Sequence, residues 1–204
     1  MLLNSEGELP IRAVEAHEAD RFAATLALAM SSDPPVRWGA PDARNYLDMW
    51  LALIPAFAGS NSIALGCAHV VGDFLGATCW LPPGEKPNDD AGWTVLTKHC
   101  DNTRLERVAA VFEEMGKHHP SEPHWYLWLI GVDPAFHGHG LGSKLMERGI
   151  AASNSDGAPC YLEATTQKVV PLYERFGFEV IDEIIVHDCP PLYPMVRYSK
   201  LGEV

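Results

Sequence analysis

The sequence contains no apolar run long enough to cross a bilayer. Its longest apolar stretches, at residues 22–30 and 49–58, fall well short of the ~20 residues that a membrane-spanning helix needs. No charged start followed by an apolar core indicates a secretory signal peptide. We therefore expect a protein with no membrane partner that works in the cytoplasm.

Positive charge is also scarce. The chain has 15 lysines and arginines against 27 aspartates and glutamates, which gives a net charge of −12. Such a surface repels the phosphates of nucleic acids, so no nucleic-acid partner is expected. The charge is compatible with a cationic substrate such as an amine, but an ordinary acidic surface explains it equally well.

Cysteine and histidine patterns typical of metal sites are missing. The five cysteines are widely spaced and form no C-x-x-C pair, which favours reduced thiols in a cytosol, most of them buried as small apolar residues. Two histidine groups, His118-His119 with His124 and His137 with His139, match no standard zinc spacing. We expect no metal.

The length and composition predict one globular domain. At 204 residues and 47% apolar content, the chain can bury a substantial core. The first ten residues are polar, so we expect a flexible segment at 1–10 and a single domain at 11–204.

The most informative stretch runs from His124 to Ile150. Residues 125–132 are almost continuously apolar and aromatic, as in a strand buried on both faces. Asp133-Pro134 ends this strand, a glycine-rich loop follows at 137–142, and a helix begins near Leu141. A glycine loop between a strand and a helix binds phosphate groups, because free backbone N–H groups and the helix dipole both favour an anion there.

The spacing of the glycines excludes two common phosphate loops. The dinucleotide fingerprint requires G-x-G-x-x-G, whereas this loop places its glycines at 138, 140 and 142. The nucleotide P-loop ends in Gly-Lys-Ser/Thr, and here the order is Gly142-Ser143-Lys144.

Two motifs instead resemble those of the GCN5-related N-acetyltransferase (GNAT) family. Val132-x-Pro134 followed by His137-x-x-Gly140-x-Gly142 is similar to the family's acetyl-CoA loop, with His137 in place of the usual Gln or Arg. Residues 166–178 resemble its second motif: Tyr173, Gly177 and Phe178 match, while Thr166 replaces an Asn and Val169 an Ala.

The resemblance implies a site for acetyl-CoA, the expected cosubstrate, and a role for Tyr173 as the general acid that protonates the leaving thiolate. In the family the central strand splays from its neighbour and its exposed backbone pairs with the pantetheine arm. The residues that the resemblance assigns to acetyl-CoA are Ile130, Gly131, Val132, His137, Gly138, His139, Gly140, Leu141, Gly142, Ser143, Thr166 and Tyr173. Gly131 is typical of a point where another chain approaches closely.

The general base that deprotonates the amine has three candidates. Glu163 lies on the strand before the second motif, where apolar surroundings favour a raised pKa for a carboxyl group. Tyr126 and His124 lie at the start of the central strand, where some members of the family have a base. The sequence offers Glu163 as one catalytic candidate and leaves the other two, and a chain of water molecules, open.

The pattern of elements predicts an α/β fold of the α+β kind. Strands are expected at 11–14, 62–70, 74–81, 125–132, 160–164, 178–186 and 193–200, and helices at 18–30, from 42 to about 57, at 102–115, from 141 to about 154, and from about 168 to 176. Residues 82–92 are expected to form a polar loop, and Gly116 to end the helix before it. We expect these elements to form a mixed, mostly antiparallel sheet with helices on both faces. This is the acyl-CoA N-acyltransferase fold that the resemblance implies.

These observations favour an acetyl-CoA-dependent N-acetyltransferase that acts on a primary amine of a small molecule. Two alternatives remain: a catalytically silent CoA-binding domain of the same fold, and an enzyme that acylates a protein N-terminus or lysine, which would need an open groove. Family members are often dimers, so a homodimer is expected by analogy alone.

Overall fold

A seven-stranded sheet forms the centre of the computed structural model, which describes residues 9–198. The strand order is β1-β2-β3-β4-β5-β7-β6, and every neighbouring pair is antiparallel except β4 with β5. The strands are β1 Ile11–Ala13, β2 Ala68–Val71, β3 Gly76–Leu81, β4 Trp125–Val132, β5 Cys160–Ala164, β6 Glu179–Val180 and β7 Tyr193–Arg197. The expected mixed, mostly antiparallel sheet is therefore confirmed.

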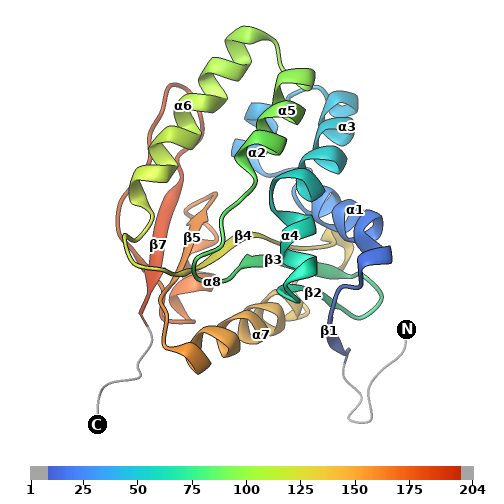
Figure 1. The fold of residues 1–204 in the computed structure, drawn as a ribbon, viewed down its shortest axis with the longest axis vertical. Helices are drawn as coiled ribbons and strands as arrows, with labels where there is room; N and C mark the ends of the chain where they lie inside the picture. The colour runs from blue at the N-terminus through green and yellow to red at the C-terminus, as the bar shows by residue number, and fades with distance from the viewer. Residues whose placement is uncertain (1–8, 199–204) are drawn as a thin grey trace.

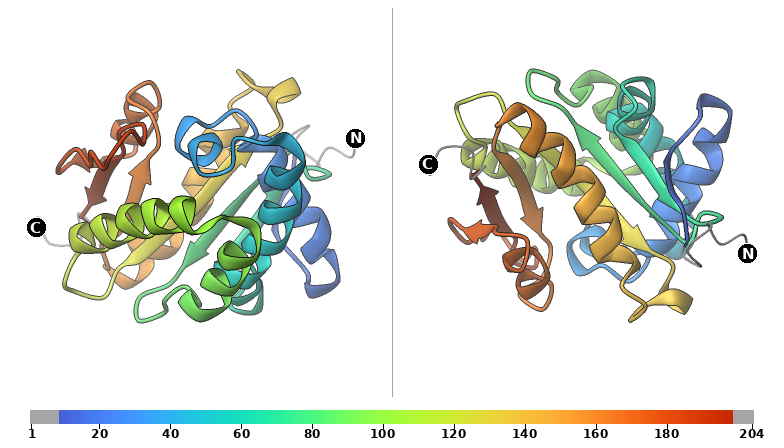
Figure 2. Two further views of the ribbon diagram at one scale, coloured as in Figure 1. Left: turned by 90° about the horizontal axis from the view of Figure 1, so that it is seen from above. Right: turned by 90° about the horizontal axis from the view of Figure 1, so that it is seen from below.

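Helices cover both faces of this sheet (Figure 1). The helices α1, α3, α5 and α6 lie on one side, and α7 crosses the opposite face, as the view from below shows (Figure 2). The helices are α1 Ala19–Ala29, α2 Pro34–Gly39, α3 Ala43–Ile54, α4 Ser60–Ala64, α5 Asp89–His99, α6 Asn102–His118, α7 Leu141–Asp156 and α8 Val170–Glu174. The two largest apolar cores lie one on each face of β3 and β4.

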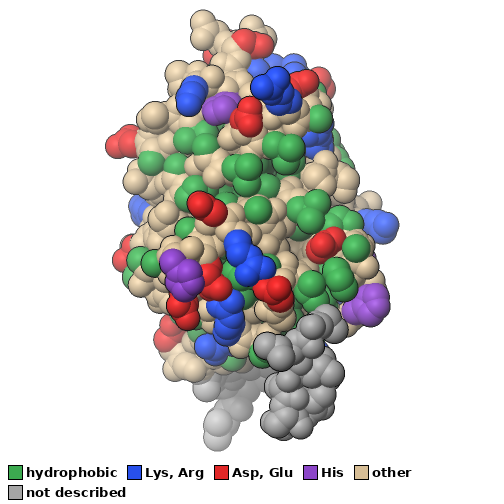
Figure 3. Space-filling view, turned by 90° about the vertical axis from the view of Figure 1, so that its right-hand side faces the viewer, with side chains coloured by type: hydrophobic (Ala, Val, Ile, Leu, Met, Phe, Trp, Pro, Cys, Tyr) green, Lys and Arg blue, Asp and Glu red, His purple; other side chains and the backbone are tan. Residues whose placement is uncertain are grey.

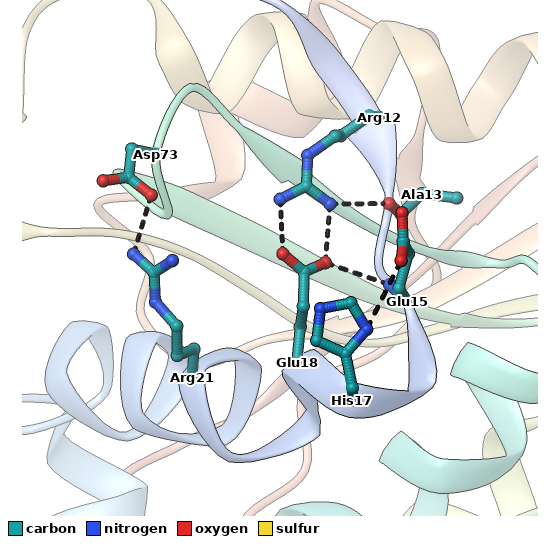
Figure 4. Close-up of polar contacts among 7 residues, drawn as sticks. All are labelled: Arg12, Ala13, Glu15, His17, Glu18, Arg21 and Asp73. Carbon is teal, nitrogen blue, oxygen red and sulfur yellow. Dashed lines mark hydrogen bonds and ion pairs between the residues drawn. The ribbon is translucent and has the colours of Figure 1, made fainter.

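Polar contacts fix the first strand to the first helix (Figure 4). Arg12 of β1 donates two hydrogen bonds to the Glu18 carboxylate, at 2.6 and 2.7 Å. The same carboxylate accepts the backbone N–H of Glu15 at 3.1 Å. The bonds from Arg12, followed by the one from the Glu15 backbone, lower the pKa of Glu18 to about 2. Arg21 of α1 also bonds Asp73, in the turn between β2 and β3, at 2.7 Å.

Strong local signals predicted most elements well. The strands at 125–132 and 160–164 have the expected bounds. Asp42 caps α3 by accepting the backbone N–H of Asn45 at 2.8 Å, and β2 and β3 form an antiparallel hairpin at the place of two expected strands. Residues 1–8 of the expected flexible segment, and residues 199–200 of the expected last strand, lie outside the described residues.

Four local predictions were wrong. Residues 60–64 are helical, because the chain continues past Pro55 through a π-helical turn at Pro55–Gly59 before β2 begins. The expected loop before Gly92 contains the start of α5, which Asn88 caps through the Ala91 N–H at 3.1 Å. Gly116 does not end α6, which continues to His118, just before the extended residue that precedes Pro120. The expected strand at 178–186 is reduced to Glu179–Val180.

The central strand β4 contains an irregularity. Cys79 of β3 lies opposite Leu129, and Trp80 lies opposite Leu127, so Trp128 is an extra residue with no partner on β3. Such a bulge breaks the alternation of side chains. As a result Trp128 and Leu129 both pack into the core beneath α1 and α3.

Beyond the bulge, β4 and β5 separate. Their parallel pairing joins only Trp125 with Cys160 and Tyr126 with Tyr161, whereas β4 stays paired with β3 as far as Val132. The edge of β4 that faces β5 is therefore open from the bulge to the end of the strand, and the candidate site lies in this gap.

The outer surface carries scattered apolar side chains. Figure 3 shows them on the side where α1 and α3 lie, and Leu28, Leu47 and Leu51 on these helices are exposed. Across residues 9–198, no helix is both long and apolar enough to span a bilayer.

Candidate active site

A groove of about 650 Å³ lies between the end of β4, the glycine loop and the start of α7. The end of α1 and the helix α8 form its other walls. Most of the residues expected to contact acetyl-CoA line it: Ile130, Gly131, Val132, His137, Gly138, Gly140, Leu141, Gly142, Ser143 and Tyr173. Asp33, Thr165 and Arg175 also line the groove. The fold thus brings both motifs to one cavity.

The glycine loop has the backbone that phosphate binding requires. Gly138 and Gly140 have positive φ values of 80° and 74°, which glycine adopts without steric cost. No atom lies within 4 Å of the position that a Cβ would occupy at either residue. Gly140 caps α7, a helix of 16 residues, so the free N–H groups of its first turn border open space and fit an anionic diphosphate.

The two histidines of the loop bond to nearby backbone oxygens. His137 Nε2 lies 2.9 Å from the Val132 carbonyl oxygen, which ties the loop to the end of β4. His139 Nδ1 lies 3.0 Å from the His137 carbonyl oxygen, and its side chain is not part of the groove lining. Thr166 is also absent from the lining, and its carbonyl oxygen accepts the N–H of Val169 at 3.1 Å.

Gly131 lies against the end of α1, a contact that the sequence did not suggest. A Cβ at this position would lie 2.3 Å from the Ala29 Cβ and 3.1 Å from Met30 Cε. The end of α1 therefore presses directly on β4. Helix packing alone therefore requires a residue without a side chain at position 131, whether or not a ligand also approaches it.

A narrow opening of about 50 Å³ continues from the groove between β4 and β5. Both the opening and the groove are lined by Ile130, Thr165 and Tyr173. Tyr173 is 8% exposed and packs edge-on against Phe178, with ring centroids 6.2 Å apart. Burial, and then the nearby Asp33 carboxylate, raise the pKa of Tyr173. Its hydroxyl therefore keeps its proton at neutral pH and is available to donate it.

On the other side of the opening lies a second, largely apolar cavity of about 140 Å³. Aromatic residues form much of its wall: Trp38, Trp50, Phe112, Tyr126 and Trp128. Trp50 stacks on Trp128, with ring centroids 6.5 Å apart and an angle of 14° between the planes. Among residues 9–198, Glu163 is the one charged residue in the lining. It also borders the opening, so its carboxylate lies where the two cavities meet.

Three segments far apart in the sequence meet beside this apolar cavity. Trp38 of α2 donates its indole N–H to Asp188 Oδ1 at 2.9 Å, and Asp188 also pairs with Arg107 of α6. Both Arg104 and Arg107 place their guanidinium groups over the Trp38 ring, 5.4 Å from its centroid. These contacts hold α2, α6 and the segment around Asp188 together beside the cavity.

The structure distinguishes the three candidate bases. Glu163 is 5% exposed at its side chain, and its Oε2 accepts the Tyr126 hydroxyl at 3.1 Å. Burial raises the pKa of Tyr126 well above its ordinary value, so Tyr126 donates a hydrogen bond and is a poor proton acceptor. His124 is absent from the lining of the pocket and of the opening.

Two contributors were not apparent from the sequence. Thr165 lines the groove, the opening and the pocket, and it bonds to Asp33, which in turn caps α2 through the Val36 N–H at 3.2 Å. The alternation of side chains along β5 places Thr165 on the same face as Glu163, which is the signal that could have identified it. Asp33-Pro34-Pro35 has the residues of a helix start, a signal that the predicted elements did not include.

Residues 79–178 match the model of the acetyltransferase (GNAT) family. This stretch belongs to that family. It contains both motifs and every residue of the opening except Met30. The N-acetyltransferase class expected from the two motifs is confirmed at the level of the family, and this GNAT domain has the acyl-CoA N-acyltransferase fold.

Known proteins agree with this assignment. An uncharacterized N-acetyltransferase of Schizosaccharomyces pombe is 27% identical over 184 residues, which is 81% of this chain and 72% of the relative. A histone acetyltransferase and related acetyltransferase structure from Corynebacterium glutamicum is 22% identical, with a TM-score of 0.67 and coverage of 97% and 99% of the two chains. A polyamine N-acetyltransferase of Drosophila melanogaster, which forms N-acetylagmatine, has a TM-score of 0.68 at 14% identity and coverage of 94% and 100%.

No group of three or more His, Cys, Asp or Glu side chains is placed to hold a metal ion in residues 9–198. The two histidine groups of the sequence are also apart: His137 and His139 bond to the backbone of the glycine loop, while His119 and His124 lie at the start of β4 beside Glu163.

Proposed function

We propose that residues 11–204 form a single domain that transfers the acetyl group of acetyl-CoA to a primary amine of a small molecule. One observation carries the proposal: the opening between β4 and β5 joins the glycine-loop groove to an apolar pocket, with Tyr173 on the groove side and Glu163 on the pocket side. Donor and acceptor would enter from opposite sides and meet in the opening.

The residues of the groove would hold the donor as the family motifs imply. The N–H groups of the loop and of the first turn of α7 would bind the diphosphate, and the open edge of β4 at Ile130–Val132 would pair with the pantetheine arm. Held in this way, the thioester would point into the opening. Tyr173 borders the opening and would donate its proton to the departing sulfur.

Glu163 would act from the other side. An aliphatic ammonium has a pKa near ~10.4, so most of the substrate is charged at neutral pH and cannot attack. The carboxylate of Glu163 would first attract this cation and then take its proton, which leaves a neutral amine facing the thioester. The transfer is direct, from sulfur to nitrogen, with no acyl group on the protein.

The walls of the pocket favour a particular kind of amine. A volume of about 140 Å³ is similar to that of an apolar cavity that admits one benzene ring. With one carboxylate in the lining, a second cationic group on the substrate would be buried without a partner, at a cost of several kcal/mol. We therefore propose a monoamine with an apolar, ring-sized body, in preference to a polyamine or a guanidinium compound.

The test begins with donor binding. Acetyl-CoA at about 100 times its Kd stabilises a folded protein by roughly 2.7 kcal/mol, which for this chain length raises Tm by about 5–10 °C. Gly140→Val should abolish this shift. Gly157→Val is the matched control, because Gly157 has the same φ of 74° at the opposite end of α7 and lies outside the groove.

Release of free thiol then identifies the acceptor. We expect a higher kcat/KM for 2-phenylethylamine than for agmatine, putrescine or a peptide with a free N-terminus. Absence of a thermal shift at millimolar acetyl-CoA would refute the transferase. Acetylation of peptides alone would favour the protein-acylating alternative, and donor binding without turnover on any amine would favour the silent CoA-binding domain.

A further inference from the structure

An amine acetyltransferase releases one proton to solvent in every turnover. The substrate enters as an ammonium with three N–H bonds and leaves as an amide with one, while a single proton ends on the sulfur of CoA. The other proton is first taken up by the base. Because the Glu163 side chain is only 5% exposed, this base needs a route by which to return its proton to water.

Two histidines connect Glu163 to the surface. His119 Nε2 lies 3.4 Å from Glu163 Oε1, on a side chain that is 27% exposed. His119 Nδ1 lies 3.1 Å from His124 Nε2, and His124 Nδ1 lies 2.8 Å from the Glu122 carbonyl oxygen. Neither histidine lines the pocket or the opening, so both lie behind Glu163, away from the substrate.

The hydrogen bonds determine which nitrogens carry protons. A carbonyl oxygen only accepts, so His124 Nδ1 must be the donor to Glu122. In the neutral ring His124 Nε2 is then an acceptor, and His119 Nδ1 must be the donor to it. This leaves the lone pair of a neutral His119 Nε2 facing the carboxylate, in agreement with the absence of a hydrogen bond to Glu163 Oε1 within the described residues.

On the basis of the proposed function, we propose that His119 and His124 form a proton relay from Glu163 to solvent. Glu163 Oε1 and His119 Nε2 face each other as two acceptors, with no proton between them to form a hydrogen bond. A proton that Glu163 takes from the substrate fills this gap and forms a Glu163–His119 hydrogen bond. When it moves onto His119 Nε2, the Nδ1 proton of His119 passes to His124 Nε2, and His124 releases its Nδ1 proton to water. Exchange of the ring protons with water then returns both histidines to their starting tautomers before the next turnover.

The surroundings of the pair support this direction of transfer. The titratable groups that face it are Glu163 and Tyr161 of β5, Tyr126 of β4 and Glu122 beside His124. Tyr126 and Tyr161 pack against the His119 ring, with centroids 4.7 and 4.2 Å away, and burial raises the pKa of both phenols, so they remain neutral. Burial also lowers the pKa of His124, which therefore passes a proton on instead of retaining it.

The test uses His119→Gln and His124→Gln, which keep a polar side chain but cannot be protonated. We expect kcat for the best amine to fall by about tenfold or more. The increase of kcat with pH should occur at higher pH than in the wild-type protein. Imidazole in the buffer should restore part of the rate. His118→Gln is the matched control, since the neighbouring His118 bonds Asp182 and the Glu114 backbone instead. The thermal shift with acetyl-CoA, whose groove excludes all three histidines, should be unchanged.

The outcomes separate the relay from the proposed function. If the wild-type protein acetylates amines, and the two variants keep its kcat and pH profile, the relay is wrong. A lower kcat with an unchanged pH profile and no rescue by imidazole would also refute it, because that pattern indicates a structural role. If His119→Gln fails to fold, His124→Gln and the proton inventory of the wild-type protein decide. In the proton inventory, a relay predicts that kcat depends on the D₂O fraction along a curve. Transfer of a single proton predicts a straight line. A wild-type protein inactive on every amine would instead contradict the proposed function.

Discussion

Tyr173 combines two properties that a general acid requires. Its ring is anchored against Phe178, and the residue lines both the groove and the opening. Because its pKa is raised by burial, deprotonation of Tyr173 should not limit the rate anywhere near neutral pH.

Tyr173→Phe should separate catalysis from packing. The substitution keeps the ring and its contact with Phe178 but removes the only proton the side chain can give. We expect kcat, followed by thiol release, to fall by about 100-fold, while the thermal shift with acetyl-CoA persists. If kcat is unaffected, the sulfur takes its proton from water and the proposed role of Tyr173 is wrong.

At the scale of single elements, contact between α7 and the sheet holds the glycine loop in place. Gly149 lies where α7 crosses β3, and a Cβ there would lie 2.3 Å from the Trp80 indole ring. Trp80 is 1% exposed, so its ring is surrounded by other buried groups. A larger residue at position 149 therefore has to push the helix away from the sheet.

We predict that Gly149→Ala destabilises the protein by about 1–3 kcal/mol, because overpacking outweighs the better helix propensity of alanine. Each kcal/mol should lower Tm by about 2–4 °C at this chain length. Gly116→Ala in α6 is the matched control: a Cβ there meets nothing within 4 Å, so this variant should be equally or more stable. A Gly149→Ala protein with unchanged Tm would show that the α7 interface is looser than the structure indicates.

At the scale of the whole molecule, the buried His69 links stability to pH. His69 lies on β2, is 6% exposed, and burial, followed by the charge of Arg148, lowers its pKa to about 4. In the unfolded chain its pKa returns to ~6.5. Between these values the unfolded state binds more protons than the folded one, so stability falls as the pH falls from about 6.5 towards 4.

His69→Gln should reduce this acid sensitivity. From the two pKa values, His69 alone accounts for roughly 2–3 kcal/mol of the free energy of unfolding lost between pH 7 and 4.5. Urea unfolding at both pH values measures the difference, which should shrink by about that amount in the variant. His17→Gln, at a side chain that is 76% exposed, should leave it unchanged. Equal losses in wild-type and His69→Gln protein would mean that His69 is protonated in the folded state.

The sequence by itself determined the elements with strong local signals. The apolar run of β4, the positive-φ glycines before α7, the Asp42 cap of α3 and the β2–β3 hairpin are all local, because they depend on neighbouring residues and on the backbone freedom of glycine. The two motifs are also short contiguous stretches, so the resemblance to the family could be found from the sequence alone. Weaker signals, such as the Asn88 cap of α5, were overlooked because the surrounding residues are polar.

Only the tertiary structure decided how the site is assembled. The bulge at Trp128 depends on the register with β3, and the gap beside it depends on where β5 leaves β4; neither is encoded in the local pattern of β4. The pocket wall at Trp38 is held by Asp188, which also pairs with Arg107, and these residues are far apart in the chain. His119 approaches Glu163 across 44 residues, and such pairings follow from packing of the whole chain, because contacts between distant segments are selected by the total burial they allow.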